Sequence, residues 1–306
     1  MMDDAPWKIV EVTSDGTRLD VWLAKQFHQL SRRGAQAFVE QGKVRVNQRT
    51  SSKSQMLNSG DKVALLVEPA PKNWRPLANP ELPIDVVIED NAFLVVNKPS
   101  GMPSTANSPD DRLTLANAII ARYPECAGIG GHNGDAGLLH RLDNDTSGLL
   151  IAARHVRAYK TLKSMQENNQ IEKRYLALVS LAAQLQAPQT ISVPLDAKRK
   201  GSKKVAVVRG GQRAVTHVEE ITAMGAFGLV KLLIYRGVRH QIRVHLAQQG
   251  APICGDPLYD GPVVPGLDRL FLHASGLTFF HPVTNQPVVT DCPLPSELLR
   301  VIEAAG

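Results

Sequence analysis

The sequence contains few cysteines and no long hydrophobic run. The three cysteines, Cys126, Cys254 and Cys292, are odd in number and far apart in the 306-residue chain. This spacing excludes a disulfide framework and a Cys-x-x-Cys metal site, and it is typical of reduced thiols in the cytosol. No apolar stretch approaches the roughly 20 residues needed to span a membrane, and residues 1–6 lack the pattern of a secretory signal. We therefore expect a cytoplasmic protein without a membrane segment.

Cofactor and metal motifs are missing as well. The chain has no P-loop, no Gly-x-Gly-x-x-Gly and no His-Glu-x-x-His. His240 and His245 are five residues apart on an expected helix, which is the wrong spacing for sharing a metal ion. We therefore expect a protein that needs neither a cofactor nor a metal.

Positive charge is concentrated in two segments of a chain whose net charge is +6. Residues 18–68 contain nine lysines and arginines against four acidic residues, and residues 196–213 contain seven against one. The rest of the chain is therefore net acidic. Two separate basic segments suit a polyanion that contacts both, so the charge distribution favours a nucleic-acid partner.

Residues 17–68 predict a compact basic α/β module. Apolar residues at helical spacing predict a helix over 18–27, and Ser31 is placed to cap a second helix that ends near Gly42. Strands are expected around 44–46 and 62–67. The pattern Arg-Leu-Asp…Ser-Arg…Gly-x-Val-x-Val-Asn…Gly-Asp resembles the S-four-type RNA-binding domain. The resemblance implies RNA contacts through four basic side chains, Arg32, Arg33, Lys43 and Arg45. A merely solvated basic face is the alternative.

A proline-rich stretch separates this module from a larger domain. Residues 69–83 contain five prolines and predict an extended linker, so the larger domain is expected over 84–303. Helices are expected over 111–122, 155–167 and 240–249, and strands over 84–89, 93–97, 149–153, 175–180, 204–208, 214–221 and 228–235. Because strands outnumber helices and follow one another directly, we expect an α+β fold with a mixed, mainly antiparallel sheet.

The most informative segment is His140-Arg141-Leu142-Asp143-Asn144-Asp145-Thr146-Ser147-Gly148. It places the carboxylate of Asp143 on a turn just before the apolar run 149–153, which predicts a buried strand. A carboxylate held at a strand edge is aimed as a nucleophile or a general base must be. The alternative is a turn in which the carboxylate bonds only its own backbone, and this is the role expected of Asp145. His140 is expected to bond backbone groups near the turn.

Three further segments carry polar residues in a functional arrangement. Residues 172–179 predict a strand with Tyr175 at its start, and residues 252–259 form a turn-rich stretch. In residues 237–246, Arg239 and Arg243 are four apart and would share one face of a helix.

Together with the motif around Asp143, these segments resemble the RluA-type family of pseudouridine synthases, from about Ile84 to Arg300. The resemblance implies that Asp143 is the catalytic aspartate and Arg243 the arginine that pairs with it. It also implies that Tyr175 stacks on the target base and that Arg141 fills the gap left in the RNA. The family usually has Gly-Arg-Thr-His where this chain has Gly237-Val238-Arg239-His240, so Arg239 is assigned no catalytic role.

The resemblance implies an isomerisation in which a uridine is flipped out of a structured RNA and its base is reattached through carbon. A run of basic residues is expected to bind RNA phosphates, and a solvated loop is the alternative. The run consists of Lys198, Arg199, Lys200, Lys203 and Lys204. The expected substrate is large-subunit ribosomal RNA, with transfer RNA as the alternative, and the expected state is a monomer. Two other functions remain open, a nucleoside or RNA glycosidase and a non-catalytic RNA-binding assembly factor.

Overall fold

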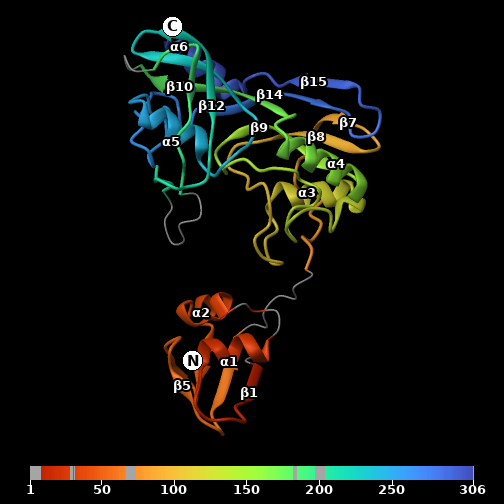
Figure 1. Ribbon diagram of the computed structural model, residues 1–306, viewed down its shortest axis with the longest axis vertical. Helices are drawn as coiled ribbons and strands as arrows, with labels where there is room; N and C mark the ends of the chain where they lie inside the picture. Colours follow the sequence, from red (N-terminus) through yellow and green to blue (C-terminus); the bar gives the residue numbers. More distant parts are fainter. Residues whose placement is uncertain are drawn as a thin grey trace. The chain divides into compact units, whose positions relative to one another are not determined.

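The computed structural model describes residues 8–27, 30, 32–66, 74–181, 185–196 and 204–305. The chain divides into two compact units, residues 1–74 and residues 75–306 (Figure 1). The prediction of a module at 17–68, a linker at 69–83 and a domain at 84–303 is close to this division, but its boundaries stay a prediction. Residues 67–73 and the expected cap Ser31 lie outside the described part.

The N-terminal unit packs two helices against short strands. Its helices are α1 (Leu19–Gln26) and α2 (Arg32–Glu40). Strands β1 (Lys8–Glu11), β6 (Lys62–Leu65), β3 (Val44–Val46) and β4 (Arg49–Thr50) form one sheet in this order, and β2 (Thr17–Arg18) pairs separately with β5 (Met56–Leu57). The alternation of buried and exposed residues in β3 and β6 places Val44, Val46, Val63 and Leu65 against the helices.

A buried carboxylate fastens these two helices together. The side chain of Asp20 on α1 is 0% exposed and accepts hydrogen bonds from Arg18, from Arg32 on α2 and from Gln36. Burial alone would raise the pKa of Asp20, but these hydrogen bonds more than offset burial, so its pKa lies below its ordinary value.

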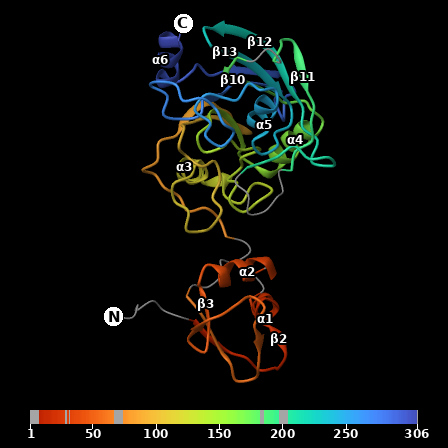
Figure 2. The ribbon, with the colours of Figure 1, turned by 90° about the vertical axis from the view of Figure 1, so that its left-hand side faces the viewer.

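The larger unit is built on one sheet of nine strands. The order is β11 (Gln189–Ile191), β12 (Thr216–Met224), β13 (Phe227–Ile234), β10 (Glu172–Ser180), β14 (Leu272–Phe280), β9 (Ser147–Ala153), β8 (Phe93–Lys98) and β7 (Asp85–Glu89), with β15 (Pro287–Asp291) paired to β14. The pairing of β9 with β14 is parallel and the other pairings described for this sheet are antiparallel. The expected mixed, mainly antiparallel α+β fold is confirmed. Figure 2 shows β10, β12 and β13 side by side in this sheet.

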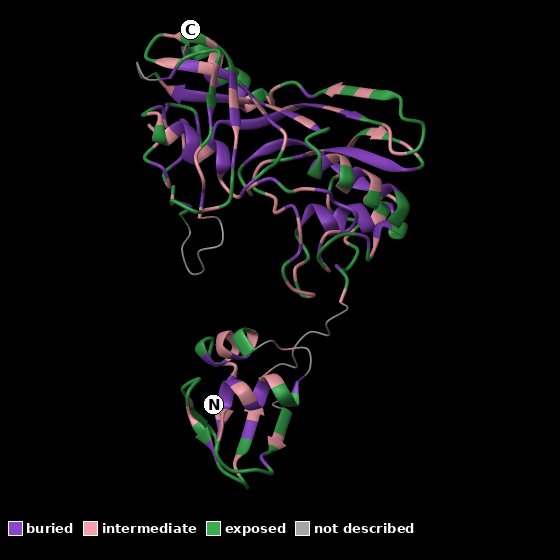
Figure 3. Ribbon diagram, in the orientation of Figure 1, coloured by how far each residue is buried: buried purple, intermediate pink, exposed green. Residues whose placement is uncertain are grey.

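Helices cover both faces of the sheet at β9, and this explains why the sequence of β9 is so apolar. All seven residues of β9 are buried (Figure 3). Leu150 shares a hydrophobic cluster with α3 (Leu115–Arg122), whereas Leu149 and Ile151 share another with α4 (Val156–Glu167). Because successive side chains of a strand point to opposite faces, both faces of β9 are covered, and its sequence is continuously apolar. Helices α5 (Gln241–Gln248) and α6 (Ser296–Ala305) complete the unit.

Several expectations about individual elements were wrong. The helix expected from Asp111 begins at Leu115, because Thr114 and Asn117 form a capping box there, while Asp111 accepts hydrogen bonds from the backbone of a preceding turn. Residues 204–208 do not form a strand, since their described pairing is a single bridge between Val207 and Leu195. Strands β11, β14 and β15 and helix α6 were not expected.

The helix expected over 240–249 begins one residue later than predicted. His240 adopts the left-handed conformation, with φ of 56°, directly before α5. Arg239 therefore lies outside the helix, and the expectation that it shares a helical face with Arg243 was wrong. In the part of the chain that the structure describes, no helix is both long and apolar enough to cross a membrane.

Candidate active site

A cavity of about 1180 Å³ opens where the motif turn, β10 and the start of α5 meet. Its wall includes Arg141, Asp143, Tyr175 and Arg243, which come from three distant parts of the sequence. The structure thus brings together the four residues that the sequence assigned to the reaction. The cavity wall contains six lysine or arginine side chains but three carboxylates: Arg141, Lys163, Lys173, Arg236, Arg239 and Arg243 against Asp143, Asp145 and Glu167. This surplus of positive charge suits a polyanionic substrate.

A buried lysine holds the turn that carries Asp143 through hydrogen bonds to backbone carbonyl groups. Lys98, the last residue of β8, is fully buried, and its Nζ donates to the carbonyl oxygens of Pro99, Met102 and Asn144 at 2.7, 2.7 and 2.9 Å. An ammonium group has three N–H donors, so all three are used. Burial lowers the pKa of Lys98 to about 7. The hydrogen bond to Asn144 places this lysine one residue from the carboxylate that it supports.

Two more side chains hold the same turn. Ser104 donates to the carbonyl of Leu142 and accepts from its backbone N–H. Arg269 donates to the carbonyl of Asp145 and to the hydroxyl of Ser147. The backbone on both sides of Asp143 is therefore held by hydrogen bonds. Asp143 itself lines the cavity.

Arg243 joins two carboxylates of different exposure. Its Nη1 donates to Oδ2 of Asp143 at 2.8 Å, and its Nε and Nη2 donate to the two oxygens of Asp256 at 2.7 and 2.8 Å. The Asp143 side chain is 27% exposed, whereas that of Asp256 is fully buried. Burial alone would lower the pKa of Arg243, but the hydrogen bonds to Asp256 and Asp143 raise it above its ordinary value. Arg243 is therefore a permanent cation beside Asp143.

A histidine and a second tyrosine surround this pair. Nε2 of His240 lies 3.7 Å from Oδ2 of Asp143, and its Nδ1 lies 2.9 Å from the hydroxyl of Tyr259. The ring of Tyr259 packs against the guanidinium of Arg243, with 5.1 Å between the ring centroid and Cζ. Burial lowers the pKa of His240, so the imidazole is neutral near pH 7.

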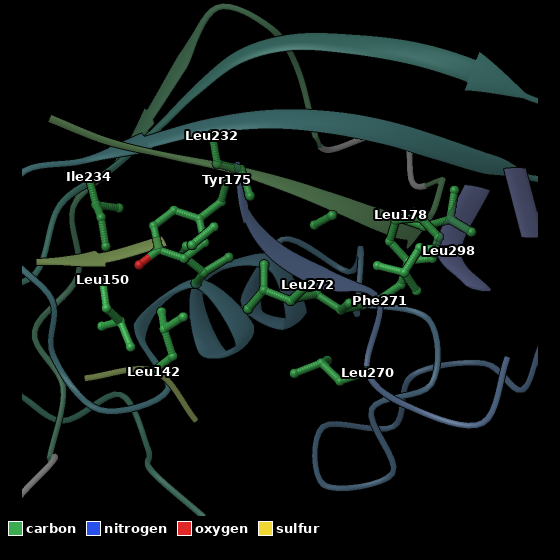
Figure 4. Packing of buried hydrophobic residues seen from close by; sticks show 14 of the residues in the cluster. Leu142, Leu150, Tyr175, Leu178, Leu232, Ile234, Leu270, Phe271, Leu272 and Leu298 are labelled. Carbon is green, nitrogen blue, oxygen red and sulfur yellow. The ribbon is translucent and has the colours of Figure 1, made fainter. Parts of the chain in front are cut away.

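Tyr175 lines the cavity although its side chain is largely buried. It is 6% exposed and packs among Leu142, Leu150 and Ile234 (Figure 4). Burial and the neighbouring charge of Asp143 raise the pKa of its hydroxyl, so the phenol stays protonated at physiological pH. Tyr175 therefore contributes an aromatic side chain to the wall of the cavity that also contains Asp143.

Val238 stands where the resembling family usually has arginine. It is 8% exposed and packs with Leu195, Val205 and Tyr259 in a small hydrophobic cluster. This position therefore adds no charge to the cavity. Arg239, the neighbouring arginine, lines the cavity from the turn before α5.

The basic residues assigned to RNA binding differ in their surroundings. In the N-terminal unit, Arg33 is exposed, Arg32 bonds Asp20, Lys43 lies over the Phe38 ring, and Arg45 is half-buried on β3. Lys204 lies 3.7 Å from a carboxylate oxygen of Asp260. The other members of the basic run, Lys198, Arg199, Lys200 and Lys203, lie outside the described residues.

His140 bonds a backbone group. Nε2 of His140 accepts a hydrogen bond from the backbone N–H of Ile151, as predicted. Within the described residues, no three His, Cys, Asp or Glu side chains gather as metal ligands would.

Sequence reasoning missed several groups that build the site, namely Lys98, Asp256, His240, Tyr259, Arg269 and Lys173. Asp256 and Tyr259 lie in the Gly255-Asp256-Pro257-Leu258-Tyr259 stretch, whose turn character was the available signal. Lys98 and Lys173 each lie at the end of an apolar strand segment. A lysine next to such a segment is the sequence feature that could have predicted a buried charge.

Comparison with known proteins supports one assignment. A family model described as RNA pseudouridylate synthase matches residues 92–248, and one described as S4 domain matches residues 17–63. The chain is 38% identical to an uncharacterized RNA pseudouridine synthase of Chloroflexus aurantiacus, over 96% of this chain and 92% of that protein. It is 32% identical to ribosomal large subunit pseudouridine synthase D of Xanthomonas campestris, over 97% of this chain and 91% of that protein.

A solved structure agrees with this result. Human RNA pseudouridylate synthase domain containing 1 superposes with a TM-score of 0.52 at 26% identity, over 70% of this chain and 84% of that chain. Because the family models, the relatives and the fold agree over nearly the whole chain, the protein belongs to the RNA pseudouridylate synthase family, and it is an RluA-type pseudouridine synthase with an S4 RNA-binding domain at its N-terminus.

Proposed function

We propose that this enzyme isomerises specific uridines of large-subunit ribosomal RNA, with Asp143 as the catalytic aspartate and with the target base flipped into the cavity. The observation that carries the proposal is the carboxylate of Asp143, held by Arg243 at 2.8 Å, in a cavity wall that also contains Tyr175. The charge-assisted hydrogen bond from Arg243 fixes the direction of this carboxylate, as a nucleophile or a base requires.

The reaction breaks the bond between N1 of uracil and C1′ of ribose and forms a bond between C5 and C1′. The base must leave the RNA stack to reach Asp143, which costs a few kcal/mol. Stacking on Tyr175 returns about 1–3 kcal/mol. Arg141, which is exposed at the cavity wall, would occupy the space that the flipped base leaves in the RNA.

Ribosomal RNA is the proposed substrate because relatives named ribosomal large subunit pseudouridine synthase D align over nearly the whole chain, including the S4 domain. The basic residues of that domain and the run around 198–204 would contact phosphates of the RNA. We further propose that the enzyme acts as a monomer in the cytoplasm, where ribosomes assemble.

A glycosidase is less well supported by the same geometry. That reaction needs a second carboxylate placed to activate water. Asp256, the carboxylate that shares Arg243 with Asp143, is fully buried and has both oxygens bonded to that arginine. Asp256 is therefore unavailable to a water molecule in the cavity, and the charged group that directly faces Asp143 is the guanidinium of Arg243, although Asp145 and Glu167 also line the cavity.

Release of tritium from RNA labelled at C5 of uridine tests the proposal. Wild-type protein should release tritium from large-subunit ribosomal RNA transcripts, and Asp143→Asn should not. Faster release from transfer RNA than from ribosomal RNA would overturn the substrate assignment. Binding without release by the wild type would instead indicate an assembly factor.

A further inference from the structure

Lys173 is a buried cation in the wall of the active-site cavity. Only 2% of the residue is exposed, and its Nζ donates to the carbonyl oxygen of Tyr235 at 2.6 Å. Among the described residues, no carboxylate forms an ion pair with it. An ammonium group has two further N–H donors. A buried lysine that has one carbonyl for a partner is costly, and such groups cluster at functional sites.

The groups around Lys173 carry more positive than negative charge. Its titratable and charged neighbours along the cavity are His140, Lys163, Glu167, Tyr175 and Arg236. Burial, and then the charge of Lys163, lower the pKa of Lys173 to about 7. Burial and the charges of Lys173 and Lys163 hold the pKa of His140 well below its ordinary value, so that ring is neutral. This end of the cavity is therefore suited to an electron-rich group of the substrate.

The position of Lys173 relative to Tyr175 indicates which electron-rich group of the substrate Lys173 would contact. The two residues are two apart on β10, so they face the same side of the sheet about 7 Å apart, while Arg174 between them points the other way and bonds Thr278. The charge of Asp143 acts on the pKa of Tyr175, whereas the pKa of Lys173 responds to burial and to Lys163. All three residues line the same cavity, so a base stacked on Tyr175 has both the Asp143 carboxylate and the Lys173 ammonium along the wall around it.

A uracil stacked on Tyr175 with its glycosidic bond at Asp143 would point its opposite edge toward Lys173. In uridine, the carbonyl C4–O4 is opposite N1. When the base rotates so that C5 replaces N1 at the ribose, the carbonyl C2–O2 takes the place of C4–O4. One fixed donor at this edge therefore meets a carbonyl oxygen before and after the rotation.

We propose that Lys173 donates a hydrogen bond to the uracil carbonyl opposite the glycosidic bond, O4 in uridine and O2 in pseudouridine, and that its charge stabilises the uracil anion between them. This inference rests on the proposed placement of the base between Asp143 and Tyr175. When the N1–C1′ bond breaks, its electron pair stays on the base, shared by N1, O2 and O4. An electron pair at C5 then forms the new bond to C1′, the C5 proton passes to solvent water, and N1 takes a proton from solvent water. Lys173 keeps its own proton throughout.

The same contact selects uridine over cytidine. Cytosine carries an amino group at C4, so two donors would face each other at Lys173. A site built around a hydrogen bond rejects an analogue that cannot make it far better than an apolar site does.

Lys173→Met tests the proposal, because methionine keeps the length of the side chain and removes its donors. Removal of one preorganised donor to a developing anion lowers kcat by about 10²–10³-fold. We expect a loss of this size with KM changed only a few-fold, and an unchanged or higher Tm, since a buried charge is removed. Lys160→Met, an exposed lysine on α4, is the matched control and should retain wild-type kcat. A kcat of Lys173→Met within threefold of the wild type would overturn the proposal.

Two measurements keep the test decisive if Lys173→Met folds poorly. The first uses wild-type enzyme and RNA with 4-thiouridine at the target, because sulfur is a weak acceptor. The reaction should slow by about tenfold or more in a single turnover, and equal rates for the two bases would contradict the contact. The second is pH dependence. The ammonium is lost as pH rises through about 7 in the free enzyme, so kcat/KM should fall on the alkaline side.

The experiments distinguish a wrong role for Lys173 from a wrong proposed function. If Asp143→Asn is inactive while Lys173→Met keeps its kcat, the assignment of Asp143 stands and the role of Lys173 is wrong. If Asp143→Asn remains active, the placement of the base on which this inference rests is wrong as well.

Discussion

Arg243 reaches Asp143 with one hydrogen bond, from Nη1 to Oδ2, because Asp256 occupies the other edge of its guanidinium group. The position of this arginine is therefore set by a buried partner and does not depend on the carboxylate that faces the cavity. The consequence is that Asp143 can be changed without releasing Arg243.

Asp143→Asn should abolish isomerisation and leave RNA affinity nearly unchanged. Asparagine keeps the shape of the side chain and can still accept from Arg243, while phosphate contacts supply most of the affinity. Tritium release and filter binding measure the two properties separately. Turnover within tenfold of the wild type would remove Asp143 from the mechanism.

Tyr175→Phe and Tyr175→Ala should differ in RNA binding. Phenylalanine keeps the aromatic face, so it retains the stacking contribution of about 1–3 kcal/mol that alanine loses. We therefore expect the affinity for a target-containing RNA to fall about 5- to 150-fold more in Tyr175→Ala. Equal losses in the two variants would contradict a stacking role.

Lys98→Met should both destabilise the larger unit and lower kcat. Three carbonyl groups lose their donor, and each unsatisfied buried acceptor costs about 1–3 kcal/mol. The carbonyl of Asn144 is one of them, so the turn that aims Asp143 loses a support. Thermal unfolding followed by circular dichroism and a tritium-release assay below Tm measure the two effects. An unchanged Tm would show that water replaces the lysine.

Acid should unfold the N-terminal unit through Asp20. Its pKa is lower in the folded state than in the unfolded chain, where it is about 3.9. The carboxylate therefore contributes stability above pH 4, and this contribution is lost as pH falls toward the folded-state pKa. All three tryptophans, Trp7, Trp22 and Trp74, belong to this unit, so intrinsic fluorescence of the full-length protein follows it selectively. Asp20→Asn should be less stable at pH 7 and show a flatter dependence below pH 4, and an identical pH profile would contradict this role.

Deletion of residues 1–74 should weaken RNA binding with little change in kcat. The side chain and backbone of Asn79 bond to Arg112 and Asn117, so the truncated chain keeps the segment that is tied to the larger unit. The slope of affinity against salt should become shallower by roughly 0.7 for each lost phosphate contact to single-stranded RNA. A large fall in kcat at saturating RNA would mean that the S4 domain helps to build the active site.

The elements predicted correctly are those whose pattern depends on local chemistry. The apolar run of β9 and the amphipathic helix α4 were visible because their burial follows from the spacing of apolar residues. The start of α3 was misplaced because Asp111 is an equally good cap by composition, and only the capping box at Thr114 decides between them.

The charged parts of the site were harder to predict. The motif around Asp143 pointed to its pairing with Arg243 only through resemblance to a family, since 100 residues separate the two. Asp256 and Lys98 owe their burial to partners that converge in the folded chain. The apolar segment before Lys98 signals that its charge is buried, but the sequence does not show its three carbonyl partners, because two of them are near it and the third is 46 residues away.

The placement of β14 between β10 and β9 has a consequence for synthesis of the protein. This strand ends at Phe280, near the C-terminus, yet it occupies the middle of the sheet. While the chain is being made, the part of the sheet that carries Tyr175 and the part that follows Asp143 stay unconnected until residue 280 has left the exit tunnel. The N-terminal unit can fold by then, whereas the cavity that contains Asp143 is completed only after β14 has been made. A ribosome-bound nascent chain is therefore expected to bind RNA before it can modify it.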